Sequence, residues 1–291
     1  MISIVICSRN ADIPLDLKEN ISVTIGAEYE LIIIDNSSNK YSIFSAYNEG
    51  VRRSKGDVLC FAHEDILFRT QDWGKVVINC FKDRSNGLLG VVGGHYLPDC
   101  PASWWSTESR SGQVLQGYHD KKNHYQTEHF YWANYKTEKE SIVNVSAVDG
   151  LWFCIPAYLF KKVKFDDHIF KGFHCYDSDI CLQILKLGLN VSVTFEILIE
   201  HISYGQQNAE YYFQKKLLFN KWKDLLPVLN GAIMSDRELS DRNNFVRELN
   251  KLIEKNIYSE LELISVKKSK AYRIGKLLLK PIHYLRLILK K

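Results

Sequence analysis

The sequence predicts an α/β protein with a mostly parallel central sheet flanked by helices, followed by a helical C-terminal extension. Over residues 1–100, short apolar runs of β-forming residues alternate with helix-like stretches, which is the pattern of a parallel sheet. The first run, 2–7, is apolar except at Ser3, as expected of a strand buried on both faces. After residue 211 the pattern becomes mostly helical.

The individual elements follow from this alternation. We expect early strands at 2–7, 29–34, 57–62 and 88–92, and helices at 15–25, 42–53 and 73–83. Lys55-Gly56 marks the end of the second helix. Later in the chain we expect a strand at 142–148, a helix at 180–187 and a strand at 190–199.

Residues 96–139 interrupt the pattern. They are rich in Trp, Tyr, His and charged residues, with no clean period, and are expected to form long loops. Loops of this length are usually functional or disordered, and the aromatic content favours a function. His119, His124 and His129 share no face of a helix or strand, so an acceptor-binding loop is favoured over a zinc site.

Composition limits the class of protein. The chain has 291 residues and a net charge of +4, far from the basic excess of a nucleic-acid-binding protein. No apolar run reaches the roughly 20 residues that cross a bilayer, and residues 1–6 lack the basic segment of a signal peptide. The seven cysteines form no CxxC pair and are expected to be reduced core thiols. These features predict a cytoplasmic protein.

Two parts are expected, a domain at 1–208 and a helical extension at 209–291. In the last residues, 267–291, Lys and Arg alternate with Leu and Ile at a helical period. Such helices bind anionic membrane surfaces, which predicts peripheral attachment to the inner face of the membrane. The alternative is an amphipathic helix that covers the core or the interface of a homo-oligomer.

Polar residues follow the strands where a ligand would bind. In an open α/β sheet, ligands bind at the carboxyl ends of the strands. Any one of these residues could be an ordinary turn residue, but their joint placement favours a binding site. The positions are Ser8-Arg9-Asn10, Asp35-Asn36, Glu64-Asp65, Asp149 and His201.

Four segments of the sequence, which occur in the same order as in that family, resemble glycosyltransferase family 2, which has the Rossmann-like GT-A fold. The matching segments are 2–10, 31–37, 46–50 and 55–65, and the resemblance extends over about 1–205. His63-Glu64-Asp65 is similar to the subgroup that has an HxD-type sequence in place of Asp-x-Asp.

The resemblance implies a nucleotide-sugar donor. Ser8, Arg9 and Asn10 would line the base and ribose pocket, and Asp35 would hydrogen-bond the uracil or ribose. Asn48 would face the nucleotide. The full set of implied donor-binding residues is Ser8, Arg9, Asn10, Asp35, Asn48, Lys55 and Glu64.

It also implies a Mn²⁺ or Mg²⁺ cofactor, with Asp65 and His201 as ligands. A divalent cation neutralises charge on the departing diphosphate, and carboxylate oxygens suit such an ion. His63 stands where an acid is usual in the family. For His201, a purely structural part is the alternative.

Asp177 matches the family's general base, which removes the proton of the acceptor hydroxyl. Tyr176 stands where the family usually has Glu. Asp179 is either an acceptor-binding residue or a helix cap. Asp149, Gly150 and Trp152 match the acceptor-side loop, where Trp152 would stack on a sugar or belong to the core.

The sequence therefore predicts an inverting glycosyltransferase that uses a nucleotide-diphosphate sugar, with UDP as the expected nucleotide. A glycan or lipid-linked saccharide is the expected acceptor, as in cell-surface polysaccharide synthesis. The alternatives are a sugar-phosphate nucleotidyltransferase, disfavoured because Cys7–Ala11 contains no glycine, and a non-catalytic nucleotide-sugar-binding module.

Overall fold

A computed structural model gives the fold, and the structure describes residues 1–134, 136–137, 139–203 and 208–268. The chain divides into two compact units, 1–246 and 247–291. The boundary predicted at 208 falls inside the first unit. Most of the basic tail, 269–291, lies outside the described residues. In the described part, no helix is long and apolar enough to cross a membrane.

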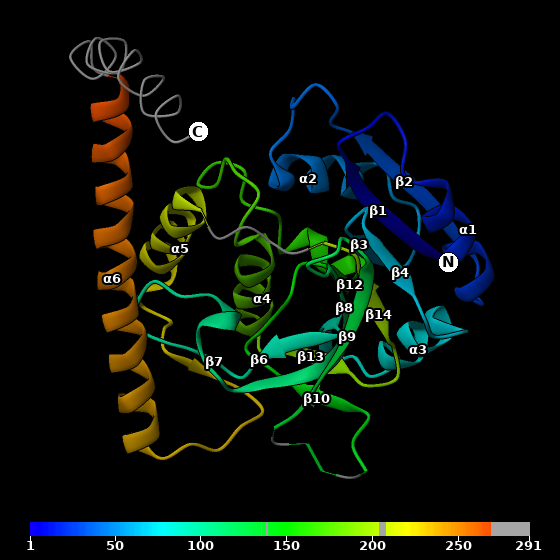
Figure 1. The fold of residues 1–291 in the computed structure, drawn as a ribbon. Coiled ribbons are helices and arrows are strands. Elements are labelled where there is room, and N and C mark those ends of the chain that lie inside the picture. The colour runs from blue at the N-terminus through cyan, green and yellow to red at the C-terminus, as the bar shows by residue number, and fades with distance from the viewer. Residues whose placement is uncertain (135, 138, 204–207, 269–291) are drawn as a thin grey trace, which may run out of the picture. The chain divides into compact units, whose positions relative to one another are not determined.

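The centre of the first unit is a seven-stranded sheet (Figure 1). Five strands run in one direction, while β12 and β10 run in the other, which confirms the mostly parallel α/β sheet. In sheet order the strands are β10 (Ile142–Asn144), β13 (Asn190–Thr194), β5 (Asn86–Gly90), β12 (Trp152–Pro156), β3 (Val58–Ala62), β1 (Ile2–Ser8) and β2 (Tyr29–Asp35).

The helices lie close to their predicted positions. Ser42 caps α2, because its hydroxyl accepts a hydrogen bond from the backbone N–H of Ser45. Asn208 caps α5 in the same way, through the N–H of Tyr211. The helices are α1 (Leu15–Thr24), α2 (Ile43–Arg53), α3 (Trp73–Cys80), α4 (Tyr176–Lys186), α5 (Ala209–Trp222) and α6 (Asp236–Lys268), with short 3₁₀ turns at Trp104–Ser106 and Ala157–Lys161.

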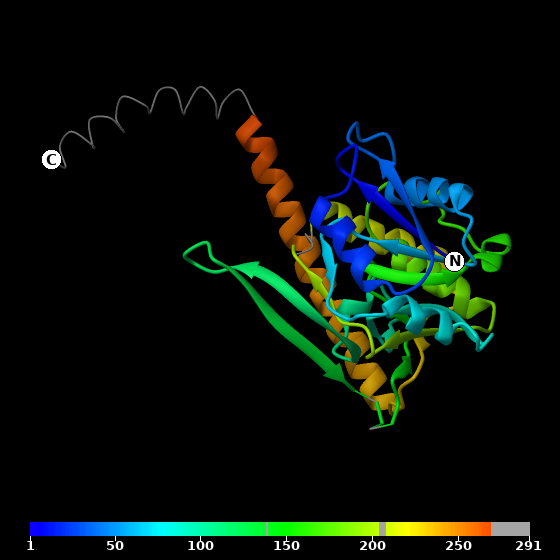
Figure 2. The same cartoon turned by 90° about the vertical axis from the view of Figure 1, so that its right-hand side faces the viewer.

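A second sheet replaces the long loops predicted at 96–139, so that prediction is wrong. Its strands are β11 (Ala147–Val148), β6 (Val92–Gly94), β8 (Arg110–His119), β14 (Ile199–His201) and β4 (Ile66–Phe68), and β9 (Tyr125–Ala133) pairs with β8. A small third sheet pairs β7 (Tyr96–Leu97) with β15 (Val228–Leu229). The β8–β9 hairpin projects from the rest of the first unit (Figure 2).

A disulfide between β3 and β12 corrects the prediction that all the cysteines are reduced. Cys60 and Cys154 lie directly opposite each other on these antiparallel strands, with their Cα atoms 4.2 Å apart. Both are fully buried beside Phe61 and Phe153, whose rings stack. The five other cysteines, Cys7, Cys80, Cys100, Cys175 and Cys181, form no disulfide and are thiols, as predicted.

The topology brings several loops to one edge of the sheet. β1, β2 and β3 are parallel, so Ser8, Asp35 and the residues after Ala62 leave the sheet at the same end. β12 is antiparallel to β3 and begins at this end, with Trp152 opposite Ala62.

Candidate active site

A cluster of three potential metal ligands forms just beyond β3. Asp65 Oδ1 lies 3.8 Å from His63 Nδ1 and 3.7 Å from His201 Nε2. The three ligand atoms lie within 4.8 Å of one another. β14 delivers His201, since it pairs antiparallel with β4 and places His201 opposite Ile66. The structure thus brings together the two predicted ligands and adds His63.

The chemistry of the cluster fits a divalent cation. The Ser203 hydroxyl donates to Asp65 Oδ2, which leaves Oδ1 directed at the two imidazoles. Burial raises the pKa of Asp65, but the positive potential of His201 and the Ser203 hydrogen bond outweigh it and lower the pKa overall. Burial and the neighbouring His201 lower the pKa of His63, so its imidazole stays neutral and can bind a metal.

Asp177 lies in the first turn of α4 and is half-buried. Burial and, next, the carboxylate of Asp149 raise its pKa to about 7. Asp149 itself lies in the turn before β12, where its Oδ1 accepts a 2.8 Å hydrogen bond from the N–H of Leu151. A carboxyl with a pKa near neutrality can take a proton from a bound hydroxyl and release it again.

The loop after β1 is held by Glu64. Its carboxylate accepts a 2.5 Å hydrogen bond from the Ser8 hydroxyl and a 3.2 Å bond from the Arg9 N–H. The side chain of Arg9 is 95% exposed, and Asn10 is exposed beside it. Asp35 lies beside Ser8 on the neighbouring strand β2, and it is also exposed. These residues border one edge, and their contact with a donor stays a prediction.

Two of the predicted donor-binding residues, Lys55 and Asn48, make hydrogen bonds within the fold. Lys55 lies at the opposite edge of the sheet, just before β3 begins, where its N–H donates to Glu30. Asn48 bridges α2 to the backbone of Phe165: its Nδ2 donates to the carbonyl at 2.8 Å, and its Oδ1 accepts from the N–H at 3.2 Å. The Nδ2 and Oδ1 atoms of Asn48 are therefore both used within the fold. These contacts argue against the donor contacts predicted for Lys55 and Asn48.

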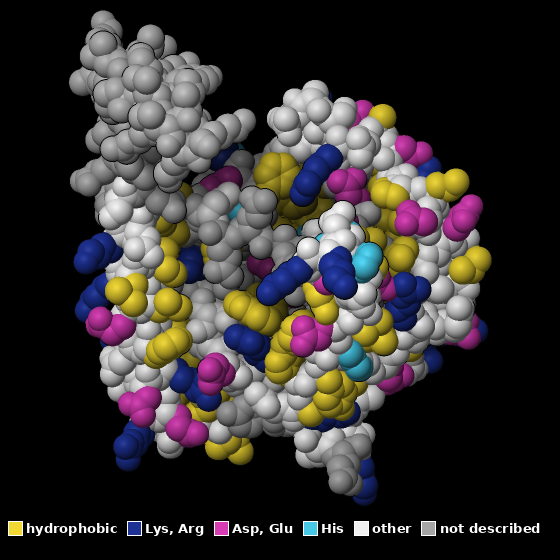
Figure 3. All heavy atoms as spheres, viewed as in Figure 1, with side chains coloured by type: hydrophobic (Ala, Val, Ile, Leu, Met, Phe, Trp, Pro, Cys, Tyr) yellow, Lys and Arg dark blue, Asp and Glu magenta, His cyan; other side chains and the backbone are white. Residues whose placement is uncertain are grey.

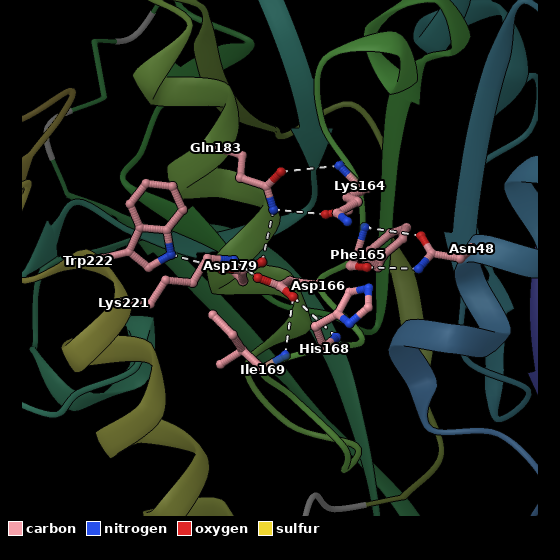
Figure 4. Close-up of polar contacts among 10 residues, drawn as sticks. All are labelled: Asn48, Lys164, Phe165, Asp166, His168, Ile169, Asp179, Gln183, Lys221 and Trp222. Carbon is pink, nitrogen blue, oxygen red and sulfur yellow. Dashed lines mark hydrogen bonds and ion pairs between the residues drawn. The ribbon is translucent and has the colours of Figure 1, made fainter.

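Asp179 is a buried residue that joins α4 to α5, which argues against the predicted contact with an acceptor. Figure 4 shows its carboxylate among Gln183 of α4 and Lys221 and Trp222 of α5. Trp222 Nε1 donates to it at 2.8 Å, Gln183 Nε2 donates at 2.9 Å, and Lys221 Nζ lies 2.7 Å away. The Asp179 side chain is only 1% exposed, which leaves no surface for a ligand.

Trp152 is also in the core, which was one of the two alternatives from the sequence, and it has no exposed face that could stack on a sugar. It is fully buried, with its ring perpendicular to Trp73 at a centroid distance of 5.9 Å. Gly150 has a steric reason to be glycine, because a Cβ atom there would lie 2.2 Å from the hydroxyl oxygen of Tyr176. Close approach by a protein side chain explains this glycine without an acceptor.

The sequence interpretation missed the parts played by His63 and Tyr176. Both were identified only as departures from the usual family residues. The signal for His63 was available in its i, i+2 spacing to Asp65, which places both on the turn after one strand.

On the face seen in Figure 3, hydrophobic side chains line a hollow just below α2, and a basic side chain stands at its rim.

The chain was compared with curated proteins and with solved structures. A search of curated proteins finds no match. Among solved structures, the crystal structure of GalNAc-T7 with UDP, GalNAc and Mn²⁺ is similar, with 13% identity and a TM-score of 0.48. The match covers 74% of this chain and 47% of that one, so the chain spans about half the length of that protein. A197 from STIV is also similar, with 12% identity, a TM-score of 0.38, and 80% and 96% of the two chains covered.

A family model gives the assignment. The model described as a glycosyltransferase-like family matches residues 3–222, which include all of the central sheet except Ile2 and every residue of the cluster. The chain therefore belongs to this glycosyltransferase-like family.

Proposed function

We propose that the protein is an inverting, metal-dependent glycosyltransferase that uses a nucleotide-diphosphate sugar, with UDP as the nucleotide. The observation that carries this proposal is the His63–Asp65–His201 cluster, which lies at the carboxyl ends of β3 and β14, and in open α/β sheets ligands bind at such strand ends. The proposed acceptor is a hydroxyl of a glycan or lipid-linked saccharide, as in cell-surface polysaccharide synthesis.

Asp177 is the proposed general base. In an inverting transfer, an acceptor oxygen attacks the anomeric carbon from the face opposite the leaving diphosphate, and a carboxylate takes its proton. Asp177 suits this step because its pKa is raised to about 7, so the deprotonated form is available near neutral pH and is a stronger base than an ordinary aspartate. Asp149 contributes through its negative charge, the second cause of that raised pKa.

His63, Asp65 and His201 are the proposed ligands of a divalent cation. When bound, this cation would neutralise the charge that develops on the departing diphosphate. Two imidazoles and one carboxylate favour Mn²⁺ over Mg²⁺, because Mg²⁺ prefers an all-oxygen environment. We therefore expect Mn²⁺ to support more activity than Mg²⁺.

The loop after β1 also bears on the nucleotidyltransferase alternative. Those enzymes need free backbone N–H groups in this loop to hold a triphosphate. Here the N–H of Arg9 donates to the carboxylate of Glu64, which places a negative charge where the triphosphate would bind. The loop geometry therefore favours a transferase that uses a sugar nucleotide over an enzyme that makes one.

A panel of nucleotide sugars, incubated with the protein, Mn²⁺ and simple saccharide acceptors, tests the proposal. We expect release of a nucleoside diphosphate from at least one donor, and a loss of about 10³-fold or more in Asp177→Asn. The exposed Asp224→Asn is the matched control and should keep wild-type activity. Full activity in Asp177→Asn would remove the base assignment, and pyrophosphate release from a nucleoside triphosphate would replace the proposed function.

The proposed place of action is the cytoplasmic face of a membrane, where a lipid-linked acceptor would be reached. This proposal depends on the pattern of Lys and Arg among Leu and Ile at 267–291.

A further inference from the structure

The two positions at which this chain departs from the usual family motifs are in direct contact. His63 stands where an acid is usual, and Tyr176 stands where a glutamate is usual. They are 113 residues apart in the chain, yet His63 Nε2 lies 2.7 Å from the Tyr176 hydroxyl oxygen. The two residues that differ from the usual family motifs therefore contact each other in the fold.

The contact determines which nitrogen of His63 carries the proton. The Tyr176 hydroxyl has one proton, and it donates to the carbonyl of Gly150 at 3.0 Å. The hydroxyl oxygen must then accept from His63, so we assign the proton of His63 to Nε2. Nδ1, which lies 3.8 Å from Asp65 Oδ1, keeps a free lone pair directed at the cluster.

The Tyr176 ring is fixed for this task. It is 5% exposed, and its ring centroid lies 5.5 Å from that of Tyr47, 6.3 Å from that of Phe44 and 6.3 Å from that of Phe153. The missing side chain of Gly150 makes room for the hydroxyl.

The backbone of the same loop holds both partners. The carbonyl of Leu151 accepts a 2.9 Å hydrogen bond from the N–H of His63, and the carbonyl of Gly150 accepts from Tyr176. His63 is therefore fixed at its backbone by one residue and at its ring by Tyr176. Metal-binding histidines in general donate their second ring N–H to such a partner, which sets the tautomer and the ring orientation.

We propose that Tyr176 is a positioning residue that holds His63 in the Nε2–H tautomer, so that His63 Nδ1 serves as a metal ligand with Asp65 and His201. This inference rests on the proposed metal site and goes beyond it. A carboxylate at position 63 would offer two oxygens in any orientation. An imidazole offers one lone pair, so its orientation must be fixed, and Tyr176 does this.

Mn²⁺ binding to the full chain without nucleotide tests the proposal, with free Mn²⁺ measured by electron paramagnetic resonance. Tyr176→Phe keeps the ring and removes only the hydroxyl, and it should weaken Mn²⁺ binding 10- to 100-fold. Tyr96→Phe is the matched control, because it also removes a buried hydroxyl with a hydrogen bond, here 2.8 Å to Asn243 Oδ1. It should leave the affinity within about twofold of wild type.

A double mutant separates positioning from general destabilisation. In the His63→Ala background, Tyr176→Phe should cause no further loss of affinity, since its effect acts through His63. Nitrogen-15 spectra of labelled histidine in the metal-free protein should show His63 protonated at Nε2 in the wild type and a mixture of tautomers in Tyr176→Phe.

Equal affinity in Tyr176→Phe and the wild type would overturn the proposal, as would no Mn²⁺ binding by the wild type or an equal further loss in the His63→Ala background. If Mn²⁺ binds and Tyr176→Phe weakens it, while no nucleotide sugar is turned over, the proposed function fails and this inference stands.

Discussion

Asp177 shows how one residue acquires its chemistry from its surroundings. An aspartate in water has a pKa near 3.8 and is a weak base, but burial and the charge of Asp149 raise the pKa of Asp177 to about 7. Perturbed values of this kind are concentrated at functional sites. The free energy that destabilises the charged form of Asp177 in the fold would strengthen it as the proposed base.

The pH dependence of transfer should report this group. We expect kcat/KM to rise with pH up to about 7, as Asp177 loses its proton, and then to level off. The stability of the fold should change in the opposite direction, because the raised pKa favours the protonated form of Asp177 in the folded protein. Asp177 therefore contributes to the free energy of unfolding below pH 3.8, and this contribution is lost as the pH rises to about 7. Asp177→Asn should therefore unfold at a higher temperature than the wild type at pH 8, as calorimetry would show. A lower unfolding temperature there would contradict the raised pKa.

At the residue scale, the sequence could predict which chemistry gathers at the edge but not how each polar atom is used. Asp65 and His201 were predicted from their places after strands together with the resemblance to glycosyltransferase family 2, and Asp177 was predicted from that resemblance alone. Asn48 and Asp179 have equally suitable side chains, yet their partners, Phe165 and Trp222, lie far away in the chain. A single sequence does not reveal these long-range hydrogen bonds.

At the scale of elements, Lys221 joins α5 to α4 and to the loop before it. Its Nζ lies 2.7 Å from Asp179 and 2.8 Å from Asp166, and all three side chains are largely buried. Lys221→Met would leave the Asp179 carboxylate without its cation, which should lower the free energy of unfolding by about 3 kcal/mol. Chemical denaturation measures this loss.

The exposed Lys223→Met is the matched control for that variant and should change stability by less than about 0.5 kcal/mol. Adding Asp179→Asn to Lys221→Met should recover part of the loss, because it removes the unpaired charge. A further loss of stability in the double variant would contradict the ion-pair explanation.

The β8–β9 hairpin is the element that the sequence did not predict. A strand with one buried face alternates apolar and polar residues, but β9 is exposed along most of its length and has no such alternation. Its pairing with β8 determines its structure, over a register that runs from Ser111 opposite Ala133 to His119 opposite Tyr125. Tertiary pairing of this kind is not visible in local sequence.

At the scale of the whole molecule, the disulfide determines how many reactive thiols the unfolded protein should have. The structure has five cysteine thiols and one Cys60–Cys154 bond. Unfolding the protein without reductant should therefore expose five reactive thiols, and reduction should raise the number to seven. Seven thiols without reductant would restore the prediction from sequence that every cysteine is reduced.

The proposed membrane attachment belongs to this scale too. The full chain should sediment with vesicles that contain anionic lipid, and this binding should fall with added salt. Truncation after residue 265 should reduce it, while uncharged vesicles should bind neither protein. Unchanged binding by the truncated chain would reject the tail as the attachment site.

Metal dependence is the central claim, and one measurement tests it most directly. Nucleoside diphosphate release should be measured for the protein stripped by a chelator, before and after Mn²⁺ is restored, beside Asp65→Ala. The account predicts almost no release from the stripped protein, recovery with Mn²⁺ and weaker recovery with Mg²⁺. In Asp65→Ala with Mn²⁺, release should be lower by about 100-fold or more. Undiminished release without a divalent cation, or in Asp65→Ala, would contradict it.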